Sequence, residues 1–273
     1  MKSDLDLCIW TLNSAKTLPL CLRSIHGGIP EDFVCHRIAV DGGSTDETVK
    51  ILEDYGWEVY ASNPGIPRQA NVALSRVDTE LFASFEHDII IPRNWFRILG
   101  CLDDDTNAIV TGLRVYAGSK ILSNINRYAE ERSKGAWGYS LDNTAYRTQI
   151  VRDLGGFPTE CPHSSDTLLR EKLAKTKYRW LIDRTIISKH LRTSFLSALQ
   201  HEIHQKTRAR YIWASSRKRE SRRFRILASP FVGARIAGMY HSPMALVGYP
   251  MLRYVNELAF LVNRRKLRFI DYS

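Results

Sequence analysis

Short apolar segments with the character of strands alternate with amphipathic helical segments along the first part of the chain. Strands are expected at residues 6–10, 36–40, 57–61 and 81–92, and each of the first three is followed by a segment with helical periodicity. This alternation predicts an α/β fold in which helices flank a mostly parallel sheet, because parallel neighbours need crossover connections. Ligands of such sheets bind beyond the carboxyl ends of the strands, so polar residues at those ends are candidate site residues.

The segment LFASFEHDIIIP, residues 81–92, interrupts an apolar strand pattern with two carboxylates. Glu86 and Asp88 are two residues apart, which places both side chains on one face of a strand. Burial of ionised carboxylates is costly unless a cation compensates, so the pair suits a divalent metal ion. The alternative is a strand that ends at His87 and is followed by a solvated turn. This segment alone does not decide between the two interpretations.

Polar residues also follow the first two expected strands. Asn13 comes shortly after the first strand, and Asp41 begins the turn DGGSTDE after the second. Ser44 and Glu47 in this turn have the spacing of a capping box, which predicts that the next helix begins there. These polar residues and the acidic motif all fall at strand ends, and this common placement indicates a binding site at one edge of the sheet.

The charge of the chain is concentrated in its last third. Residues 192–273 contain 16 of the 39 Lys and Arg residues and 4 of the 29 Asp and Glu residues, a net charge of +12. The remaining 23 basic and 25 acidic residues give residues 1–191 a net charge of −2. We therefore expect a catalytic domain over residues 1–191 and a basic, amphipathic, helical extension over residues 192–273.

The cysteines and the N-terminal residues indicate a cytoplasmic protein. The five cysteines form no CxxC pair and have no zinc-type spacing, which favours a reducing compartment. The opening MKSDLDLCIW has two acidic residues before any apolar run and does not resemble a secretory signal. No run of 18 or more uncharged apolar residues is present, and a conventional membrane span is not expected.

The expected extension combines a basic segment with an apolar one. Lys and Arg are frequent over residues 206–225, with Tyr211 and Trp213 between them, and residues 226–262 are mainly apolar. This composition suits an anionic membrane surface, near which each Lys or Arg contributes about 1 kcal/mol. Two alternatives stay open: a solvated helix packed on the catalytic domain, and a homodimer face formed by the apolar segment. A basic tail can also bind nucleic acid, which is the less expected partner.

Five short blocks between residues 5 and 190 occur in a characteristic order. They are WTLN at residues 10–13, DGGSTD at 41–46, Gly65 with Ala70 and Asn71, EHD at 86–88, and GGF at 155–157 followed by Ser165 and Asp166. In this order they resemble the motifs of the GT-A-fold glycosyltransferases, specifically the large inverting family 2. Four residues differ from those that the family has at the same places: Leu12, Gly42, Glu86 and Ser165.

The resemblance implies roles for individual residues. Asp88 and Glu86 match the metal motif that binds Mn²⁺ or Mg²⁺, and His190 matches a histidine that completes this site in some members. Asp166 matches the carboxylate that would take a proton from an acceptor hydroxyl. The residues expected to bind the donor are Thr11, Asn13, Asp41, Arg68, Glu86 and His87. The alternatives are an exposed helix arginine for Arg68, a helix N-cap for Asp166 and an ordinary strand-end residue for His190.

The function that this resemblance implies is that of an inverting glycosyltransferase, cytoplasmic and peripheral to the inner face of the membrane. It would transfer a sugar from a UDP- or GDP-sugar to a hydroxyl of a glycan or lipid-linked acceptor, with a metal that neutralises the leaving diphosphate. A polyprenyl phosphate acceptor would need no general base, because a phosphate is already ionised at pH 7. Other hypotheses are a nucleotidyltransferase, a nucleic-acid-binding protein that acts through its basic tail, and an inactive sugar-nucleotide binder.

Overall fold

The structure is a computed structural model that describes residues 4–132, 139–160, 165–191, 195 and 226–262. The chain divides into two compact units, residues 1–115 with 135–191 and residues 116–134 with 192–273. The segment 116–134, which the charge pattern grouped with the first domain, belongs to the second unit by its packing. The chain therefore passes between the units near residues 115, 134 and 191.

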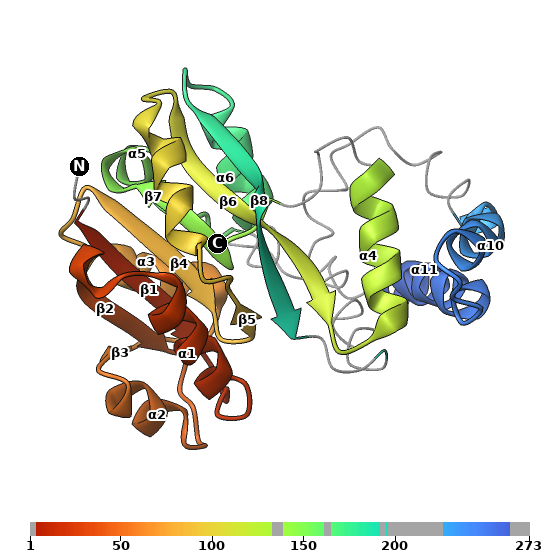
Figure 1. The fold of residues 1–273 in the computed structure, drawn as a ribbon, viewed down its shortest axis with the longest axis horizontal. Coiled ribbons are helices and arrows are strands. Elements are labelled where there is room, and N and C mark those ends of the chain that lie inside the picture. The colour runs from red at the N-terminus through yellow and green to blue at the C-terminus, as the bar shows by residue number, and fades with distance from the viewer. Residues whose placement is uncertain (1–3, 133–138, 161–164, 192–194, 196–225, 263–273) are drawn as a thin grey trace. The chain divides into compact units, whose positions relative to one another are not determined.

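The first unit is built on an eight-stranded sheet with the strand order β3-β2-β1-β4-β7-β6-β8-β5 (Figure 1). The strands are β1 (Leu5–Thr11), β2 (Val34–Asp41), β3 (Glu58–Ala61), β4 (Leu81–Glu86), β5 (Ile89–Ile90), β6 (Asn107–Ala117), β7 (Asn143–Arg147) and β8 (Arg179–Leu191). β1 pairs in parallel with β2 and β4, and β2 pairs in parallel with β3. β7 is antiparallel to β4 and β6, and β5 is antiparallel to β8. The predicted α/β class is confirmed, with the parallel pairs in the N-terminal part of the sheet.

Helices cover both faces of this sheet. The α-helices are α1 (Leu18–Gly28), α2 (Thr48–Asp54), α3 (Ile66–Leu74), α5 (Thr148–Asp153) and α6 (Ser165–Leu173), and the 3₁₀ helices are η1 (Glu31–Phe33) and η2 (Trp95–Asp103). Side chains of β1 alternate between two cores, as the two-residue period of a strand requires. Leu5, Leu7 and Ile9 pack in one cluster with residues of α1 and η2. Cys8 and Trp10 pack in the other with residues of α3, α5 and α6, so both faces of β1 are buried.

The apolar run of residues 81–92 is not one continuous strand. β4 ends at Glu86, a turn follows at His87 and Asp88, and β5 contains only Ile89–Ile90. Of the two interpretations of this segment, the one with a strand end and a turn at the motif agrees with the backbone, but Glu86 and Asp88 are half-buried and not fully solvated. The physical reason for the turn is that β5 leaves β4 to pair with β8, so the chain changes direction at the acidic motif.

The sequence pattern does not indicate β7, because this strand lacks an apolar alternation. Its polar side chains are nevertheless buried in the middle of the sheet. Trp95 Nε1 donates a hydrogen bond to Asn143 Oδ1 at 2.6 Å, and Asn143 Nδ2 donates to the carbonyl oxygen of Gly112 at 2.9 Å. Thr144 donates from its hydroxyl to the carbonyl oxygen of Ser140 at 2.7 Å. Specific hydrogen bonds thus replace the apolar packing that a strand prediction looks for.

The second unit contains α4 (Lys120–Arg132), α10 (Ser229–Met239) and α11 (Ala245–Val262). Leu122 of α4 packs with Leu252 of α11, and Tyr128 of α4 packs with Ile236 of α10. Within the described residues, no helix has both the length and the apolar character that a bilayer-spanning helix needs. The basic parts of the predicted extension, residues 192–194, 196–225 and 263–273, lie outside the described residues.

Candidate functional site

Hydrogen bonds to one carboxylate join the loops that follow β1 and β2. The buried Asp41 lies at the end of β2. Its Oδ1 accepts hydrogen bonds from the hydroxyls of Thr11 (3.0 Å) and Ser44 (2.6 Å), and its Oδ2 accepts from the N–H groups of Gly43 (2.9 Å) and Ser44 (2.7 Å). Ser44 therefore stabilises this turn. The sequence spacing predicted that Ser44 caps the next helix, and this prediction is wrong. The next helix, α2, begins later, at Thr48.

Asn13 provides a second link between the same two loops. Its backbone is left-handed, with φ of 49°, a conformation that asparagine adopts more readily than most residues. The N–H of Asn13 donates to Ser44 Oγ at 2.7 Å, and its Oδ1 accepts from the N–H of Thr45 at 2.9 Å. The structure thus brings Thr11, Asn13 and Asp41 together at the carboxyl ends of β1 and β2.

The first turn of α3 is anchored to the same edge of the sheet. Gln69 is buried, and its Nε2 donates to the carbonyl oxygens of Thr11 (2.8 Å) and Val40 (2.9 Å). Its Oε1 accepts from the N–H of Gly65 at 3.2 Å. Arg68, predicted to contact the donor, precedes Gln69 and is exposed to solvent. The start of α3 is therefore fixed by Gln69, while Arg68 stays accessible.

The acidic motif at the end of β4 is held between α1 and β8. His87 Nδ1 lies 3.0 Å from Thr17 Oγ1, next to the start of α1. The antiparallel pairing of β5 with β8 places Ile89 opposite His190. This register brings His190, which is about a hundred residues away in the sequence, beside Glu86.

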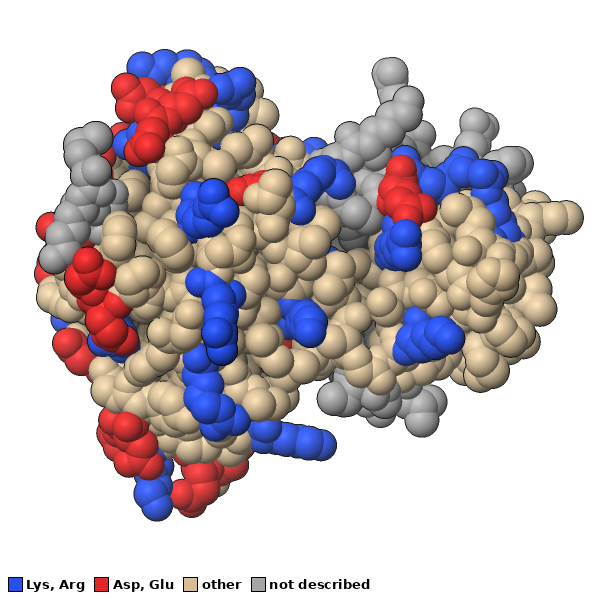
Figure 2. All heavy atoms as spheres, in the orientation of Figure 1, with Lys and Arg blue, Asp and Glu red and all other residues tan. Residues whose placement is uncertain are grey.

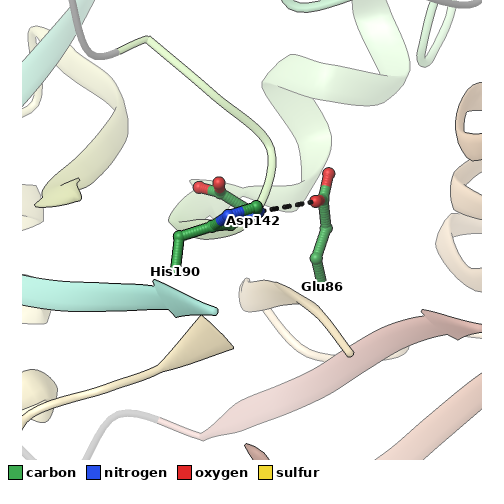
Figure 3. Close-up of side chains that lie close together, drawn as sticks. All are labelled: Glu86, Asp142 and His190. Carbon is green, nitrogen blue, oxygen red and sulfur yellow. Dashed lines mark ion pairs between the residues drawn. The ribbon is translucent and has the colours of Figure 1, made fainter. Parts of the chain in front are cut away.

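Glu86, Asp142 and His190 converge on one point (Figure 3). One ligand atom of each side chain lies within 4.8 Å of the others. His190 is almost fully buried, and its Nε2 lies 3.7 Å from Glu86 Oε2 and 3.3 Å from Asp88 Oδ1. Asp88, predicted as a metal ligand, is outside the compact group of three but contacts its histidine. The arrangement offers two carboxylates and an imidazole to a cation.

Asp142 is fully buried and is the most strongly constrained member of the cluster. Arg114 Nη1 donates to its Oδ2 at 2.5 Å, and the hydroxyl of Ser140 donates to its Oδ1 at 2.5 Å. Burial acts to raise the pKa of Asp142, but the charge of Arg114, the neighbouring His190 and the Ser140 hydrogen bond together hold this pKa below its ordinary value. Asp142 is therefore ionised, and a carboxylate with one donor on each oxygen keeps lone pairs for a metal ion.

Asp166 lies in the first turn of α6 and is half-buried. Its Oδ1 accepts a hydrogen bond from the N–H of Thr167 at 2.6 Å. Burial raises the pKa of Asp166, the charge of Arg114 opposes this rise, and the charge of Asp142 adds to it. Asp166 thus shares the electrostatic environment of the cluster, and its raised pKa suits a group that exchanges a proton.

Asp142 and Arg114 are the two residues of this region that sequence reasoning missed. Asp142 directly precedes β7, the strand that has no apolar signature, so nothing marked it as a strand-end residue. Because β7 runs antiparallel to β4, its N-terminal end and the carboxyl end of β4 lie at the same edge of the sheet. The only feature of the sequence that could have indicated Asp142 is its place next to a short and unusually polar segment.

The comparison with protein families is decisive for the class of the protein. The family described as "Glycosyl transferase family 2" matches residues 6–173, more than half of the chain. The chain belongs to glycosyl transferase family 2. In this family 2 glycosyltransferase, the matched region contains the loops of Thr11 and Asp41, the acidic motif, Asp142 and Asp166, while His190 follows it.

Solved structures share the fold of this glycosyltransferase. The mannosyltransferase PcManGT from Pyrobaculum calidifontis, in complex with GDP-Man and Mn²⁺, has a TM-score of 0.65 and 17% identity, over 100% of this chain and 89% of that chain. TarS 1-349 from S. aureus has a TM-score of 0.54 and 17% identity, over 99% and 93%. Glucosyl-3-phosphoglycerate synthase from Mycobacterium tuberculosis, in complex with Mn²⁺, UDP and glucosyl-3-phosphoglycerate, has a TM-score of 0.52 and 17% identity, over 72% and 75%. These likenesses confirm the predicted GT-A-like fold. No curated protein matches the chain.

Proposed function

We propose that this family 2 glycosyltransferase is an inverting, metal-dependent enzyme that transfers a sugar from a UDP- or GDP-sugar to a hydroxyl of a glycan or lipid-linked acceptor. The observation that carries the proposal is the convergence of Glu86, Asp142 and His190. These residues lie at the edge of the sheet where ligands of α/β proteins bind. The charges of Arg114 and Asp142 also act on the carboxyl group of Asp166.

The chemistry of the cluster fits Mn²⁺ or Mg²⁺. Two carboxylates and one imidazole within 4.8 Å can share one ion, and the imidazole favours Mn²⁺ slightly over Mg²⁺. Among the described residues, the buried Oδ1 of Asp88 has no hydrogen-bond partner and makes an ion-pair contact with His190. We assign Glu86, Asp142 and His190 as ligands, with Asp88 as a further ligand or as the group that orients His190. When bound, the metal supplies positive charge that neutralises the leaving diphosphate.

The residues of the chain itself would orient the donor and activate the acceptor. Thr11, Asn13 and Asp41 lie at or just after strand ends that hydrogen bonds already hold in one shape, so little conformational freedom is lost when a nucleotide binds. The exposed Arg68 at the start of α3 is placed to contact the diphosphate. Asp166 would take the proton of the acceptor hydroxyl as that oxygen attacks the anomeric carbon. Attack from the face opposite to the diphosphate inverts the configuration.

His87 belongs to the proposed donor site as well. Its Nδ1 is held 3.0 Å from Thr17 Oγ1, so this contact fixes the ring and leaves Nε2 for a ligand. The neighbouring Glu86 would then act both in the cluster and next to the donor. Glu86 is the last residue of β4, and His87 begins the turn that follows it.

Similar solved structures support the donor class and the metal. PcManGT contains GDP-Man and Mn²⁺, and the mycobacterial synthase contains UDP and Mn²⁺. A structure of S. aureus TarS 1-349 with UDP-GlcNAc has a TM-score of 0.51 and 17% identity to this chain. A nucleotide sugar with either base is therefore compatible with a fold of this kind, and the proposal keeps UDP and GDP.

The acceptor and the location form the last part of the proposal. We place the enzyme in the cytoplasm, peripheral to the inner face of the membrane, where a lipid-linked acceptor is presented. A polyprenyl phosphate is the second candidate acceptor, since exposed apolar side chains on α10 and α11 suit a lipid. The two acceptors differ in their need for Asp166, because an ionised phosphate can attack without a general base.

Thermal unfolding with UDP, GDP and their sugars, with and without Mn²⁺, tests this function. We expect stabilisation by one nucleotide in the presence of Mn²⁺, by about 2.7 kcal/mol when the ligand is at a hundred times its Kd. Asp142→Asn should abolish this stabilisation. Asp153→Asn, which changes an exposed carboxylate on α5, is the matched control and should leave it unchanged. The absence of any shift with every nucleotide would contradict the proposed function.

A further inference from the structure

Gln69 on α3 contacts three segments of the proposed donor site through one buried side-chain amide. Its Nε2 donates to the carbonyl oxygens of Thr11 at the end of β1 (2.8 Å) and of Val40 near the end of β2 (2.9 Å). Its Oε1 accepts from the N–H of Gly65, which directly precedes α3 (3.2 Å). Both amide hydrogens are therefore used, and the side chain is only 4% exposed. A buried amide with its donors fully used fixes the relative positions of the groups that it contacts.

The amide of Gln69 lies where the first two strands cease to pair. The register of β1 with β2 ends at Thr11 and Asp41. The carbonyl oxygen of Thr11 then accepts from the N–H of Gly42 at 2.9 Å as well as from Gln69. The loops of the proposed donor site begin beyond this point. Gln69 thus ties the first turn of α3 to the last positions that the sheet itself holds.

The turn before α3 packs closely on the turn after β2. A Cβ at Gly42 would lie 3.2 Å from Pro64 Cα and 3.3 Å from Gln69 Nε2, closer than an ordinary van der Waals contact. A Cβ at Gly65 would instead have Arg68 Cδ, at 4.0 Å, as its nearest neighbour outside the adjoining residues. The packing is therefore close on the side of Gln69 and open on the side of Arg68.

The diphosphate of a donor needs a cation at a defined place. The face of the first unit drawn in Figure 2 carries its described Lys and Arg side chains in small groups among acidic and uncharged ones. Arg68 is exposed, and within the described ranges of the chain no carboxylate forms an ion pair with it. Its guanidinium is thus available to an anionic ligand. Because Gln69 is the next residue in the chain, the hydrogen bonds that fix Gln69 also fix the backbone of Arg68.

We propose that Gln69 is a positioning residue that sets the separation between Arg68 and the loops of Thr11 and Asp41. These two parts would hold the two ends of one nucleoside diphosphate, with the loops at the nucleoside and Arg68 at the diphosphate. A ligand that spans both parts binds well only when their separation matches it. The inference rests on the proposed function, and it assigns to Gln69 a role in nucleotide affinity that is separate from its contribution to stability.

A double-mutant cycle between Arg68 and Gln69 tests the proposal. The variants are Arg68→Ala, Gln69→Leu and their combination, and leucine keeps much of the volume of glutamine but removes its three hydrogen bonds. Isothermal titration with UDP and with GDP in the presence of Mn²⁺ measures nucleotide affinity, and titration with MnCl₂ alone measures the metal site. Asn107→Ala controls for lost stability, because it removes a buried amide that donates to the carbonyl oxygen of Cys101 at 2.9 Å, at the start of β6. Urea denaturation shows whether each variant is folded under the conditions of the titration.

Arg68→Ala and Gln69→Leu should each lower the affinity for the nucleotide that the parent chain binds by about tenfold, the loss expected for one hydrogen bond to a charged group. The combined variant should also lose about tenfold rather than about a hundredfold, because an arginine that is already displaced contributes little. Mn²⁺ affinity should stay unchanged, since the hydrogen bonds of Gln69 lie at β1, β2 and the start of α3 and not at the proposed metal ligands. Asn107→Ala should bind the nucleotide like the parent chain.

Losses that multiply in the combined variant would overturn the proposal, as would unchanged affinity in either single variant, and the proposed function would stand. A loss in Asn107→Ala as large as that in Gln69→Leu would assign the effect to stability and would also overturn it. A parent chain that binds neither UDP nor GDP would contradict the proposed function and remove the inference with it. If Gln69→Leu does not fold, Gly42→Ala takes its place in the cycle with the same expected result, because its Cβ presses on Pro64 and Gln69 and displaces the same turn.

Discussion

The side-chain amide of Asn71 on α3 forms two hydrogen bonds with the backbone of Phe157. Nδ2 donates to the carbonyl oxygen at 2.8 Å, and the N–H of Phe157 donates to Oδ1 at 2.8 Å. Gly156 lies against the same amide, and a Cβ at this glycine would come within 2.5 Å of Asn71 Oδ1. Gly156 also has a left-handed φ of 73°, which disfavours any other residue. Asn71 thus ties α3 to the turn of Gly156 and Phe157, which precedes Asp166 in the chain.

Asn71→Ala should lower the free energy of unfolding by about 2 kcal/mol, because two hydrogen bonds are lost and the backbone groups of Phe157 are left without partners. Urea denaturation followed by circular dichroism measures this change. Asn63→Ala, at an exposed position, is the control and should stay within about 0.5 kcal/mol of the parent chain. Equal stability of the two variants would show that the Asn71 contact contributes nothing.

Removal of the imidazole at His190 should weaken Mn²⁺ binding. His190→Ala takes away the only nitrogen ligand of the cluster, and we expect the affinity to fall at least about tenfold. Isothermal titration of the protein with MnCl₂ measures this directly, without a donor. His36→Ala changes a histidine on β2 whose side chain is 44% exposed, and the Mn²⁺ affinity of this variant should match that of the parent chain. Unchanged binding in His190→Ala would remove this residue from the proposed ligand set.

The pH dependence of the rate should report on Asp166. Burial raises the pKa of this carboxyl, so kcat should fall as the pH is lowered through a value above the usual range for aspartate. Stability has the opposite sign: the contribution of Asp166 is fully present below its unfolded pKa and is lost as the pH rises through the raised folded pKa. Asp166→Asn should reduce kcat by about 10² to 10⁴ and remove the acidic limb. Activity that is retained in Asp166→Asn would favour the phosphate acceptor.

Much of the first unit could be predicted because its strands are apolar on both faces. The runs at β1 and β2 and the helices between them have clear periods, and the parallel order follows from the crossovers. β7 could not be found in this way, because Asn143 and Thr144 are satisfied by specific hydrogen bonds that depend on the finished sheet. The break at His87 and Asp88 depends on pairing with β8, which is distant in the sequence.

The candidate site was predictable where the sequence carries local motifs. Thr11, Asn13 and Asp41 lie together as the strand-end argument implies. The register of β5 with β8 brings His190 to the acidic motif, although spacing alone could not show that register. Asp142 was missed because its position depends on an antiparallel strand without an apolar pattern. Site residues that belong to local motifs can thus be predicted from the sequence. Site residues whose position depends on strand pairing between distant segments cannot.

Asp6 shows how a buried carboxylate can serve stability alone. It lies near the start of β1, at the end of that strand away from the candidate site, and is fully buried. Its Oδ1 accepts from the N–H of His36 at 3.1 Å, and its Oδ2 accepts from the N–H groups of Asp78 (2.8 Å) and Thr79 (3.3 Å). Asp6→Ala leaves three backbone N–H donors without the carboxylate that accepts from them. It should therefore lower the free energy of unfolding by about 3 kcal/mol or more.

The same variant should leave Mn²⁺ affinity and the Michaelis constant for the donor unchanged at a temperature where it is folded, because the side-chain contacts of Asp6 with His36, Asp78 and Thr79 lie at the start of β1 and not at the cluster. Urea denaturation and Mn²⁺ titration of one preparation provide both readouts. Asp32→Ala, at an exposed carboxylate in η1, controls for the loss of charge and should alter neither. If Asp6→Ala weakened Mn²⁺ binding as His190→Ala does while stability stayed the same, the division between a structural and a functional carboxylate would be wrong. The expected result separates the two ends of β1: hydrogen bonds at its start hold the sheet together, and polar groups at its end belong to the proposed donor site.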